Sequence, residues 1–284
     1  MNNLADSENK IELREHQLIM LDILKEFSSF CDKHGLKYYL DAGTLLGAVR
    51  HHGFIPGDND LNLCLMRKDY NKLLQIAKNQ NGMINDHLIL EVPEDTIYCF
   101  CKIGDIRTKL IEFPDTYPEE CYIYIDIFPK DGLMGLGIGT KMTCKISEIL
   151  GLFHWFNKHS IPYWKTKMTG IKKVIATIAS YIVKDKNKPY KLQTKWISRN
   201  AKLHPFDKCD YVTTLVNGEY YRIAPKKCFD DRVLLEFEGQ QFFAPVGYDE
   251  WLKILYGNNY MTPPKKHGVH NVLAFWRSNI GDKK

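Results

Sequence analysis

The feature that most constrains this chain is the order of elements that residues 36–66 predict. The stretch "LKYYLDAG" is typical of a buried strand that ends in a glycine turn. The stretch "TLLGAVRHH" predicts a short helix that opens at Thr44. After a turn, "DNDLNLCLM" alternates polar and apolar residues and predicts a second strand. These residues therefore predict a strand, turn, helix and strand in immediate succession.

The second strand of this unit carries the candidate chemistry. Side chains two residues apart share one face of a strand, so Asp58, Asp60 and Asn62 are expected on one side. Mg²⁺ and Mn²⁺ prefer oxygen ligands and are commonly held by one or two carboxylates together with substrate phosphates. The pattern favours metal-assisted transfer of a phosphoryl or phosphodiester group. The alternative is a solvated turn, because "PGDN" is also turn chemistry.

Candidate phosphate-binding groups surround this strand. Gly43 and Thr44 lie between a strand and a helix start, where free backbone N–H groups can bind phosphate. This order of elements is nucleotidyltransferase-like. Arg50, Lys102 and Arg107 are candidates for binding donor phosphates, because Arg offers planar bidentate donors and Lys a mobile charge. Surface solvation is the alternative for these three, and a helix-entry role is the alternative for Gly43.

The remaining elements predict an α/β or α+β fold with a mixed sheet. Apolar residues at helical spacing predict helices over residues 11–34, 67–80 and 248–257, with Gly35 as the C-cap of the first. Strands are expected at "HLILEV", "TIYCFCKI", "TKLIEF" and "CYIYIDIF", the last ending at "PKDG", and later at "VLLEFEG" and "QQFFAPV".

Residues 133–205 differ in character from the rest of the chain, and we interpret them as a helical basic insertion. Residues 10–132 would form the core, and residues 206–284 would complete the same domain. Residues 141–200 contain 13 Lys/Arg and 2 Asp/Glu. An uncharged run from Val174 to Val183 is too short to span a bilayer, but its Lys, Trp and Tyr neighbours suit an anionic membrane surface. A core helix pair with solvated lysines explains the pattern equally well.

Composition excludes several classes of protein. The chain has 284 residues, 44% hydrophobic and 26% charged, which suits a globular domain. Its eight cysteines form no CxxC pair, so no structural zinc site is expected. The polar start "MNNLADSENKIELREH" does not resemble a signal peptide, so we expect a cytoplasmic protein. The basic character has no nucleic-acid-binding motif behind it, so no nucleic-acid partner is expected.

Four ordered blocks make a family resemblance specific. The stretch "YYLDAGTLLGAVRHHGFIPGDNDLNL" resembles the signature of the LicD family of phosphotransferases, which is related to fukutin and fukutin-related protein. The similarity extends to "RKDY", to "YIDIFPKDG" around Asp126 and to "FFAPVGYDEWLKILYGNNYMTPP". It covers most of the chain outside residues 133–205. The family pattern continues Gly-Phe-Ile-Pro-Trp and then Asp-Asp-Asp-Ile-Asp.

The resemblance implies a nucleotidyltransferase-like mixed β-sheet flanked by helices, a CDP-linked donor and a Mg²⁺ or Mn²⁺ cofactor. By position, Asp60 would be a metal ligand, Asp58 its neighbour on the same face and Asp126 a third carboxylate from a separate strand. This chain departs from the pattern at the metal site, where Asn59 and Asn62 replace aspartates and Gly57 replaces the tryptophan. An Asn oxygen can coordinate a cation but carries no formal charge.

The resemblance implies that the protein moves phosphocholine, or another alcohol or polyol phosphate, onto a cell-surface glycan or its lipid-linked precursor. The expected location is cytoplasmic and peripheral at the inner face of the membrane. The alternative is a catalytically impaired glycan- or nucleotide-binding protein, because Asn62 weakens the metal site. An antibiotic- or tRNA-directed nucleotidyltransferase is a weaker alternative. Histidines at 51, 52, 267 and 270 are more typical of packing or solubility than of catalysis or metal binding.

Overall fold

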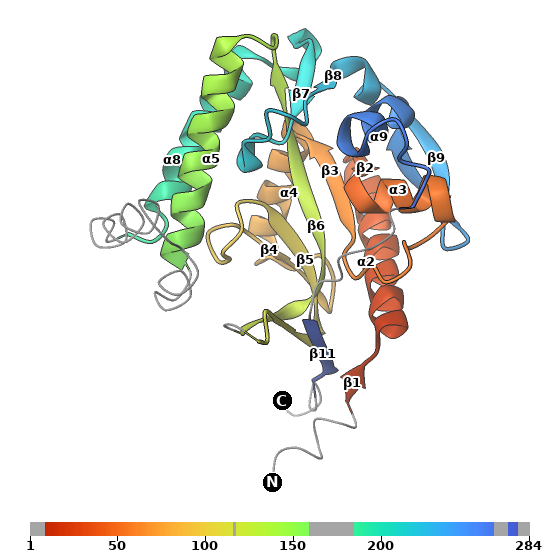
Figure 1. The fold of residues 1–284 in the computed structure, drawn as a ribbon. Coiled ribbons are helices and arrows are strands. Elements are labelled where there is room, and N and C mark those ends of the chain that lie inside the picture. The colour runs from red at the N-terminus through yellow and green to blue at the C-terminus, as the bar shows by residue number, and fades with distance from the viewer. Residues whose placement is uncertain (1–8, 116–117, 159–184, 264–271, 278–284) are drawn as a thin grey trace.

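The protein is built around one mixed β-sheet with helices on its faces (Figure 1). The structure, a computed structural model, describes residues 9–115, 118–158, 185–263 and 272–277. In the described part of the chain the sheet contains nine strands, six of which lie in the order β1-β11-β5-β6-β3-β2. The fold class predicted from the sequence, a mixed sheet flanked by helices, is confirmed. The six strands are β1 (Lys10–Ile11), β11 (Val272–Trp276), β5 (Cys101–Glu112), β6 (Glu119–Leu133), β3 (Asn62–Met66) and β2 (Tyr38–Leu40).

The central pairing of the sheet is parallel and brings the candidate residues together. Strands β3 and β6 run parallel with Asn62 opposite Asp126, whereas β5 pairs with β6 antiparallel with Lys102 opposite Asp126. Residues paired in this way point to the same face of a sheet. The other strands of the sheet are β4 (Leu88–Glu91), which pairs with β5, and β7 (Tyr211–Thr213) and β8 (Ala224–Pro225), which extend the upper end of β6.

Alternation along β6 separates an apolar face from the face that carries the site. Ile123, Ile125 and Ile127 are fully buried, while Asp126 and Phe128 point to the opposite side. Helices α2 (Leu13–His34) and α4 (Arg67–Asn79) cover the apolar face, where the Tyr70 hydroxyl of α4 donates a hydrogen bond to Cys101 Sγ of β5. Helix α2 buries its apolar stripe and ends at Gly35 with a φ of 60°, so its C-cap was predicted correctly.

Helices α3 (Ala42–His51) and α9 (Tyr248–Tyr256) lie next to each other (Figure 1). The hairpin of β9 (Arg232–Phe237) and β10 (Gln240–Pro245) lies on the same side of the molecule as these two helices. The prediction that α3 begins at Thr44 was wrong by two residues. Asp41 accepts a hydrogen bond from the Ala42 N–H, so the helix already begins at Ala42. Strand β3 begins only at Asn62, so Asp58 and Asp60 belong to the preceding loop rather than to the strand.

Two other strand predictions needed correction. The last three residues of "TIYCFCKI" and the first five of "TKLIEF" belong to one strand, β5, which has an irregularity between Asp105 and Leu110, and residues 96–100 lie outside any strand. Strand β6 continues through Pro129 to Leu133, because its last residues exchange the partner β3 for β7. Strands β1, β7, β8 and β11 were not predicted, since strands of two to five residues show little periodicity.

The segment interpreted as a helical insertion contains helices α5 (Ile138–Lys158) and α8 (Lys188–Leu203) in its described residues. They pack against each other at one side of the sheet, where Gln193 of α8 donates hydrogen bonds to Ser147 of α5. The uncharged run from Val174 to Val183 lies outside the described residues. Within the residues that the structure describes, no helix combines the length and apolar character needed to cross a membrane. The division of the domain at residues 133 and 205 stays a prediction.

Candidate functional site

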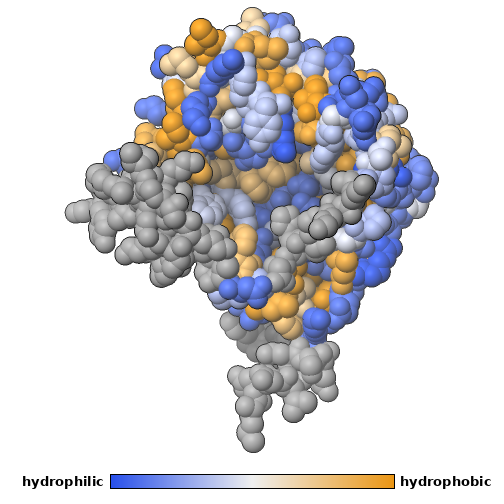
Figure 2. Space-filling view, viewed as in Figure 1, coloured by the Kyte–Doolittle hydropathy of each residue, from blue (hydrophilic) through white to orange (hydrophobic). Residues whose placement is uncertain are grey.

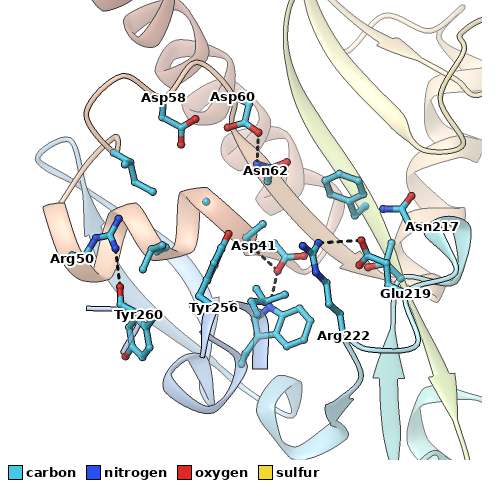
Figure 3. A pocket seen from close by; sticks show the side chains of 18 of the residues that line it. Asp41, Arg50, Asp58, Asp60, Asn62, Asn217, Glu219, Arg222, Tyr256 and Tyr260 are labelled. Atoms are coloured by element: carbon cyan, nitrogen blue, oxygen red, sulfur yellow. Dashed lines mark hydrogen bonds and ion pairs between the residues drawn. The ribbon is translucent and has the colours of Figure 1, made fainter. Parts of the chain in front are cut away.

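A pocket of about 720 Å³ opens on the polar face of the sheet (Figure 3). The N-terminus of α3 and the loop before β3 form one wall, and β6 forms its floor. Helix α9 and the segment 214–222 form the other walls. Charged and polar side chains from all four parts line it: Asp41, Arg50, Asp58, Asp60, Asn62, Lys130, Asn217, Glu219, Arg222, Tyr256 and Tyr260.

Asp41 fixes the geometry of this pocket. Its carboxylate accepts hydrogen bonds from the Ala42 N–H (2.9 Å) and from Trp251 Nε1 (2.7 Å), and it pairs with the Lys130 ammonium at 2.8 Å. Asp41 and Lys130 are both buried. Burial lowers the pKa of Lys130, but the Asp41 carboxylate outweighs this effect and the net pKa is raised. Ala42 has a φ of 45°, a conformation that turns the chain sharply from β2 into α3.

Asp58 and Asp60 face each other at the mouth of the pocket (Figure 3). Gln17 of α2 donates a hydrogen bond to the Asp58 carbonyl oxygen at 2.8 Å and holds the loop in place. Desolvation, together with the hydrogen bond and charge of Asp60, raises the pKa of Asp58 to about 8. The folded protein therefore favours the protonated form of Asp58. Gly43 lies opposite this pair, and a Cβ there would make a tight contact of 3.3 Å with Asp58 Oδ2.

A row of polar side chains crosses three strands beside this pair. Asn62 donates to Asp60 Oδ2 at 3.1 Å, and its strand neighbour Asp126 pairs with the Lys102 ammonium at 3.0 Å. The pKa of Asp126 is raised to about 6 by the sum of three effects. Burial raises it most, the Lys102 ammonium lowers it, and the charge of Asp60 raises it. The Lys102 ammonium lies over the ring of Tyr124, 3.1 Å from its centroid. Asp126 and Asp60 therefore sense each other's charge, although Asp126 is buried below the pocket surface.

The candidate phosphate-binding residues lie in different environments, and only some of them line the pocket. Gly43 and Arg50 line the pocket. The Thr44 hydroxyl instead accepts a hydrogen bond from the Asn62 N–H at 2.7 Å, so it ties α3 to β3. Lys102 is buried and not solvated, because Asp126 and the aromatic rings enclose it. Arg107 lies outside the pocket lining and forms an ion pair with Asp105 at 2.6 Å, and its role in binding phosphate stays a prediction.

Arg50 has one donor group that its neighbours do not use. Its Nη1 donates to the Tyr260 carbonyl oxygen at 2.7 Å and its Nε to His51 Nε2 at 2.9 Å. Its Nη2 is buried and has no hydrogen-bond partner among the described residues. Burial lowers the pKa of Arg50, so its charge favours a nearby anion. His51 thus supports Arg50, while His267 and His270 lie outside the described residues.

Sequence reasoning missed the wall that comes from the C-terminal part of the chain. Glu219 and Arg222 form an ion pair at 3.1 Å in the pocket, and Tyr256 projects into it between α3 and α9 (Figure 3). No local pattern marks these residues, because they face the pocket only after the C-terminal part packs on α3. Lys130 lies in the "DIFPKDG" block and could have been found, since a lysine inside a buried strand needs a partner.

The predicted metal ligands are not gathered into one cluster. In residues 9–115, 118–158, 185–263 and 272–277, no group of three or more His, Cys, Asp and Glu side chains could hold a metal ion. Asp58, Asp60 and Asn62 offer two carboxylates and an amide oxygen, whereas Asp126 already has Lys102 as its counter-ion. Two adjacent carboxyl groups in a pocket wall suit a divalent cation whose remaining ligands come from substrate phosphates. This part of the pocket fits Mg²⁺ or Mn²⁺.

Comparisons with known proteins place these residues in a recognised context. Residues 35–133 match the family model described as LicD/FKTN/FKRP, nucleotidyltransferase domain. This range includes Asp41, Asp58, Asp60, Asp126 and Lys130. The lipopolysaccharide cholinephosphotransferase LicD of Haemophilus influenzae is 29% identical over 265 residues, which cover 90% of this chain and 94% of that protein. The resemblance inferred from the sequence motifs is confirmed.

Two further relatives are similar to this chain over shorter stretches. The ribitol 5-phosphate transferase FKRP of Homo sapiens is 27% identical over 106 residues, or 35% of this chain and 18% of that protein. An uncharacterized protein of Rickettsia prowazekii is 32% identical over 114 residues, or 40% of each chain. Both cholinephosphate and ribitol 5-phosphate are alcohols esterified with phosphate, so the two named relatives move chemically similar groups.

Proposed function

We propose that this chain is a phosphotransferase that modifies a glycan, because residues 35–133 match the LicD/FKTN/FKRP family model and the chain is similar to two named transferases of alcohol phosphates. The observation that carries this proposal is the pocket in which the Asp58–Asp60 pair faces Gly43 at the N-terminus of α3. A helix N-terminus favours phosphate, and carboxylates opposite it favour a cation bound to that phosphate. Arg50, whose buried Nη2 has no hydrogen-bond partner among the described residues, lines the same pocket and adds a positive charge that favours an anionic donor.

We assign the donor to the CDP-linked class and the transferred group to phosphocholine. The lipopolysaccharide cholinephosphotransferase, which matches most of this chain, supports this choice. The acceptor hydroxyl attacks the phosphorus that carries the choline, the bond from this phosphorus to the bridging oxygen breaks, and CMP leaves. The proton of the hydroxyl passes to the Asp58 carboxylate, whose raised pKa suits a general base. A divalent cation at this pair, Mg²⁺ or Mn²⁺, would neutralise charge on the donor phosphates.

The remaining charges of the pocket suit the same donor. Arg50 and Arg222 both line the pocket and can bind phosphate oxygens. Arg222 is partly exposed, and its ion-pair partner Glu219 lies on the same segment. Lys130 forms a buried ion pair with Asp41, and this pair holds the pocket wall in place. Asp126 and Lys102 lie beneath the pair and set its electrostatic environment. The acceptor is a cell-surface glycan or its lipid-linked precursor.

The test is release of CMP from CDP-choline in the presence of Mg²⁺ or Mn²⁺, with and without a glycan acceptor. Replacing Asp60 with Asn should lower the rate by about a hundredfold or more, since a charged group in the pocket is lost. Asp207→Asn, a change of an exposed aspartate outside the pocket, is the matched control and should have the wild-type rate. Equal CMP release from Asp60→Asn and the wild type would overturn the proposal.

The rival function is a nucleotide- or glycan-binding protein without turnover. Two observations favour it. In the described part of the chain, no three His, Cys, Asp or Glu side chains form a group that could hold a metal ion, and Asn62 lines the pocket. Calorimetric titration with CDP-choline separates the two functions. Binding of CDP-choline without any release of CMP, at every metal concentration tested, would favour the binding protein over the phosphotransferase.

A further inference from the structure

Tyr256, the last residue of helix α9, lines the pocket with a hydroxyl group that the protein itself does not use. Figure 3 shows its side chain in the middle of the pocket, with the hydroxyl turned toward the loop that carries Asp58 and Asp60. The hydroxyl forms no hydrogen bond with any residue that the structure describes. The residue is 44% exposed, so a bound substrate can reach it. An unused donor inside a polar pocket is available to a ligand.

Three carboxylates lie close enough to this hydroxyl to act on its pKa. Desolvation by the surrounding atoms raises the pKa of Tyr256 most, and the charge of Asp41 raises it further. Arg222 lowers the pKa, whereas Asp60 and Asp58 raise it. The ordinary pKa of a tyrosine is about 10, so this hydroxyl carries its proton at neutral pH with or without these charges. The side chain is therefore a hydrogen-bond donor that bonds none of the three carboxylates around it.

The same carboxylates mark the part of the pocket that the hydroxyl faces. Asp41 is the N-cap of α3, and Asp58 and Asp60 lie opposite Gly43 in the first turn of that helix. This end of α3 favours phosphate, and the carboxylate pair opposite it favours a cation bound to that phosphate. In Figure 2, hydrophilic residues predominate on the surface that α9 forms beside this part of the pocket. The surroundings of the hydroxyl therefore suit a charged phosphate ester.

Contacts on both sides of Tyr256 along the chain fix the position of its side chain. Before it, Trp251 Nε1 donates to Asp41 at 2.7 Å and joins α9 to the start of α3. After it, the Tyr260 carbonyl oxygen accepts a hydrogen bond from Arg50 Nη1 at 2.7 Å, which joins the chain beyond α9 to the end of α3. Such anchoring holds a side chain in one place before the substrate binds, as a group that acts on a reacting phosphate must be held.

We infer that the Tyr256 hydroxyl donates a hydrogen bond to a non-bridging oxygen of the phosphate group that is transferred, an inference that rests on the proposed function. Negative charge is spread over these oxygens while the acceptor oxygen bonds to phosphorus and the bond to the CMP oxygen breaks. A fixed neutral donor stabilises this charge and does not repel a cation at the Asp58–Asp60 pair. The hydroxyl keeps its proton throughout. The attacking hydroxyl of the acceptor instead needs a group that accepts its proton, so the phosphate is the better partner for Tyr256.

The contact is tested in the full chain with Tyr256→Phe, which removes the hydroxyl and keeps the ring. The kcat for CMP release from CDP-choline should fall by about tenfold or more, because one donor to the transition state is lost. The melting temperature and the KM for the glycan acceptor should stay at their wild-type values, since the hydroxyl bonds none of the described residues. Tyr248→Phe, in the first turn of the same helix and outside the pocket lining, is the matched control and should keep the wild-type kcat.

Binding without turnover identifies which phosphate the hydroxyl contacts. CMP lacks the phosphate that carries the choline, whereas CDP-choline contains it. Tyr256→Phe should therefore weaken the binding of CDP-choline by about threefold or more and leave the binding of CMP unchanged. Calorimetric titration of both nucleotides with Mg²⁺, in the absence of a glycan acceptor, measures these affinities.

Four results in Tyr256→Phe would overturn the inference. A wild-type kcat together with a wild-type affinity for CDP-choline would show that the hydroxyl touches no substrate. An equal loss of affinity for CMP and CDP-choline would place the hydroxyl at the nucleotide, and a raised acceptor KM with unchanged kcat would place it at the acceptor. A clear drop in melting temperature would give the hydroxyl a structural role.

Failure of the proposed function gives a different result, namely a wild type that binds CDP-choline and releases no CMP. In that case a selective loss of CDP-choline affinity in Tyr256→Phe would still support the contact with this phosphate, and an unchanged affinity would overturn it. A wild type that does not bind CDP-choline at all would overturn both the proposed function and the inference.

Discussion

Asp58 and Asp60 place two carboxyl groups side by side in a pocket wall, an arrangement that works against folding. Desolvation and the neighbouring Asp60 make the Asp58 proton harder to remove in the folded chain than in the unfolded chain. The folded state therefore binds this proton more tightly. Such destabilising clusters are typical of functional sites, where the bound ligand or cation relieves the repulsion.

The first prediction concerns the pH dependence of stability. The pKa of Asp58 is about 8 in the folded protein and has an ordinary value of 3.8, so its contribution to stability falls as pH rises from about 4 to 8. Asp58→Asn should remove this decline and raise the unfolding free energy at pH 8 by about 1–3 kcal/mol, allowing for solvent screening. Urea unfolding in EDTA at both pH values measures it. A decline of the same size in Asp58→Asn would show that another group causes it.

The second prediction concerns Asn62, which donates to Asp60 and is buried. Asn62→Asp replaces this donor with a third carboxylate, so the metal-free protein should lose about 1–3 kcal/mol of stability. The added charge should also strengthen binding of Mg²⁺ or Mn²⁺, so the melting temperature should rise more on metal addition than in the wild type. Asn59→Asp, outside the pocket lining, is the control. An equal metal-induced shift in both variants would show that Asn62 does not face the cation.

At the scale of elements, a close backbone contact joins helix α3 to the loop that follows it, beside the pocket mouth. The Gly53 N–H bonds the Gly47 carbonyl oxygen, and a Cβ at Gly47 would lie only 2.4 Å from the Gly53 carbonyl oxygen. This close approach leaves room for glycine alone. It fixes the start of the loop that carries Asp58 and Asp60.

The third prediction follows from that contact. Gly47→Ala should push the loop away from α3, destabilise the protein by about 1–3 kcal/mol and reduce CMP release at temperatures where the variant is fully folded. The matched control is Gly137→Ala, where a Cβ would meet nothing within 4 Å. Circular-dichroism melting and the CMP assay measure the two effects. Gly47→Ala with normal activity would mean that the loop does not need this contact.

Local patterns predicted the elements that depend on local forces. Helix α2 and the β9–β10 hairpin follow from periodicity and turn residues, and Asp58, Asp60 and Gly43 follow from the family motif. The unity of β5 and the role of Lys102 were not predictable, because both depend on pairing with β6. Arg222 and Tyr256 reach the pocket only through long-range packing. A sequence motif therefore identifies one wall of the pocket and gives little information about the opposite wall.

At the scale of the whole molecule, one buried contact joins three distant parts of the chain. Asp41 at the start of α3, Lys130 at the end of β6 and Trp251 of α9 meet beside the pocket. Lys130 also donates to the Thr214 hydroxyl at 3.1 Å, which brings in the segment that leads to Arg222. The pocket walls are thus held by charges and hydrogen bonds that no single segment contains.

The last prediction tests this contact. Lys130→Met leaves the buried Asp41 carboxylate without its cation, so the unfolding free energy should fall by about 3–5 kcal/mol. The double variant Asp41→Asn with Lys130→Met removes both charges and should recover much of this loss, because an unpaired buried charge is the main penalty. Lys253→Met breaks the exposed pair with Asp249 and should change stability by less than about 1 kcal/mol. Urea unfolding of all three variants at neutral pH measures the differences. If Lys130→Met and Lys253→Met lost equal stability, the Asp41–Lys130 pair would not be the contact that joins β6 to α3 and α9.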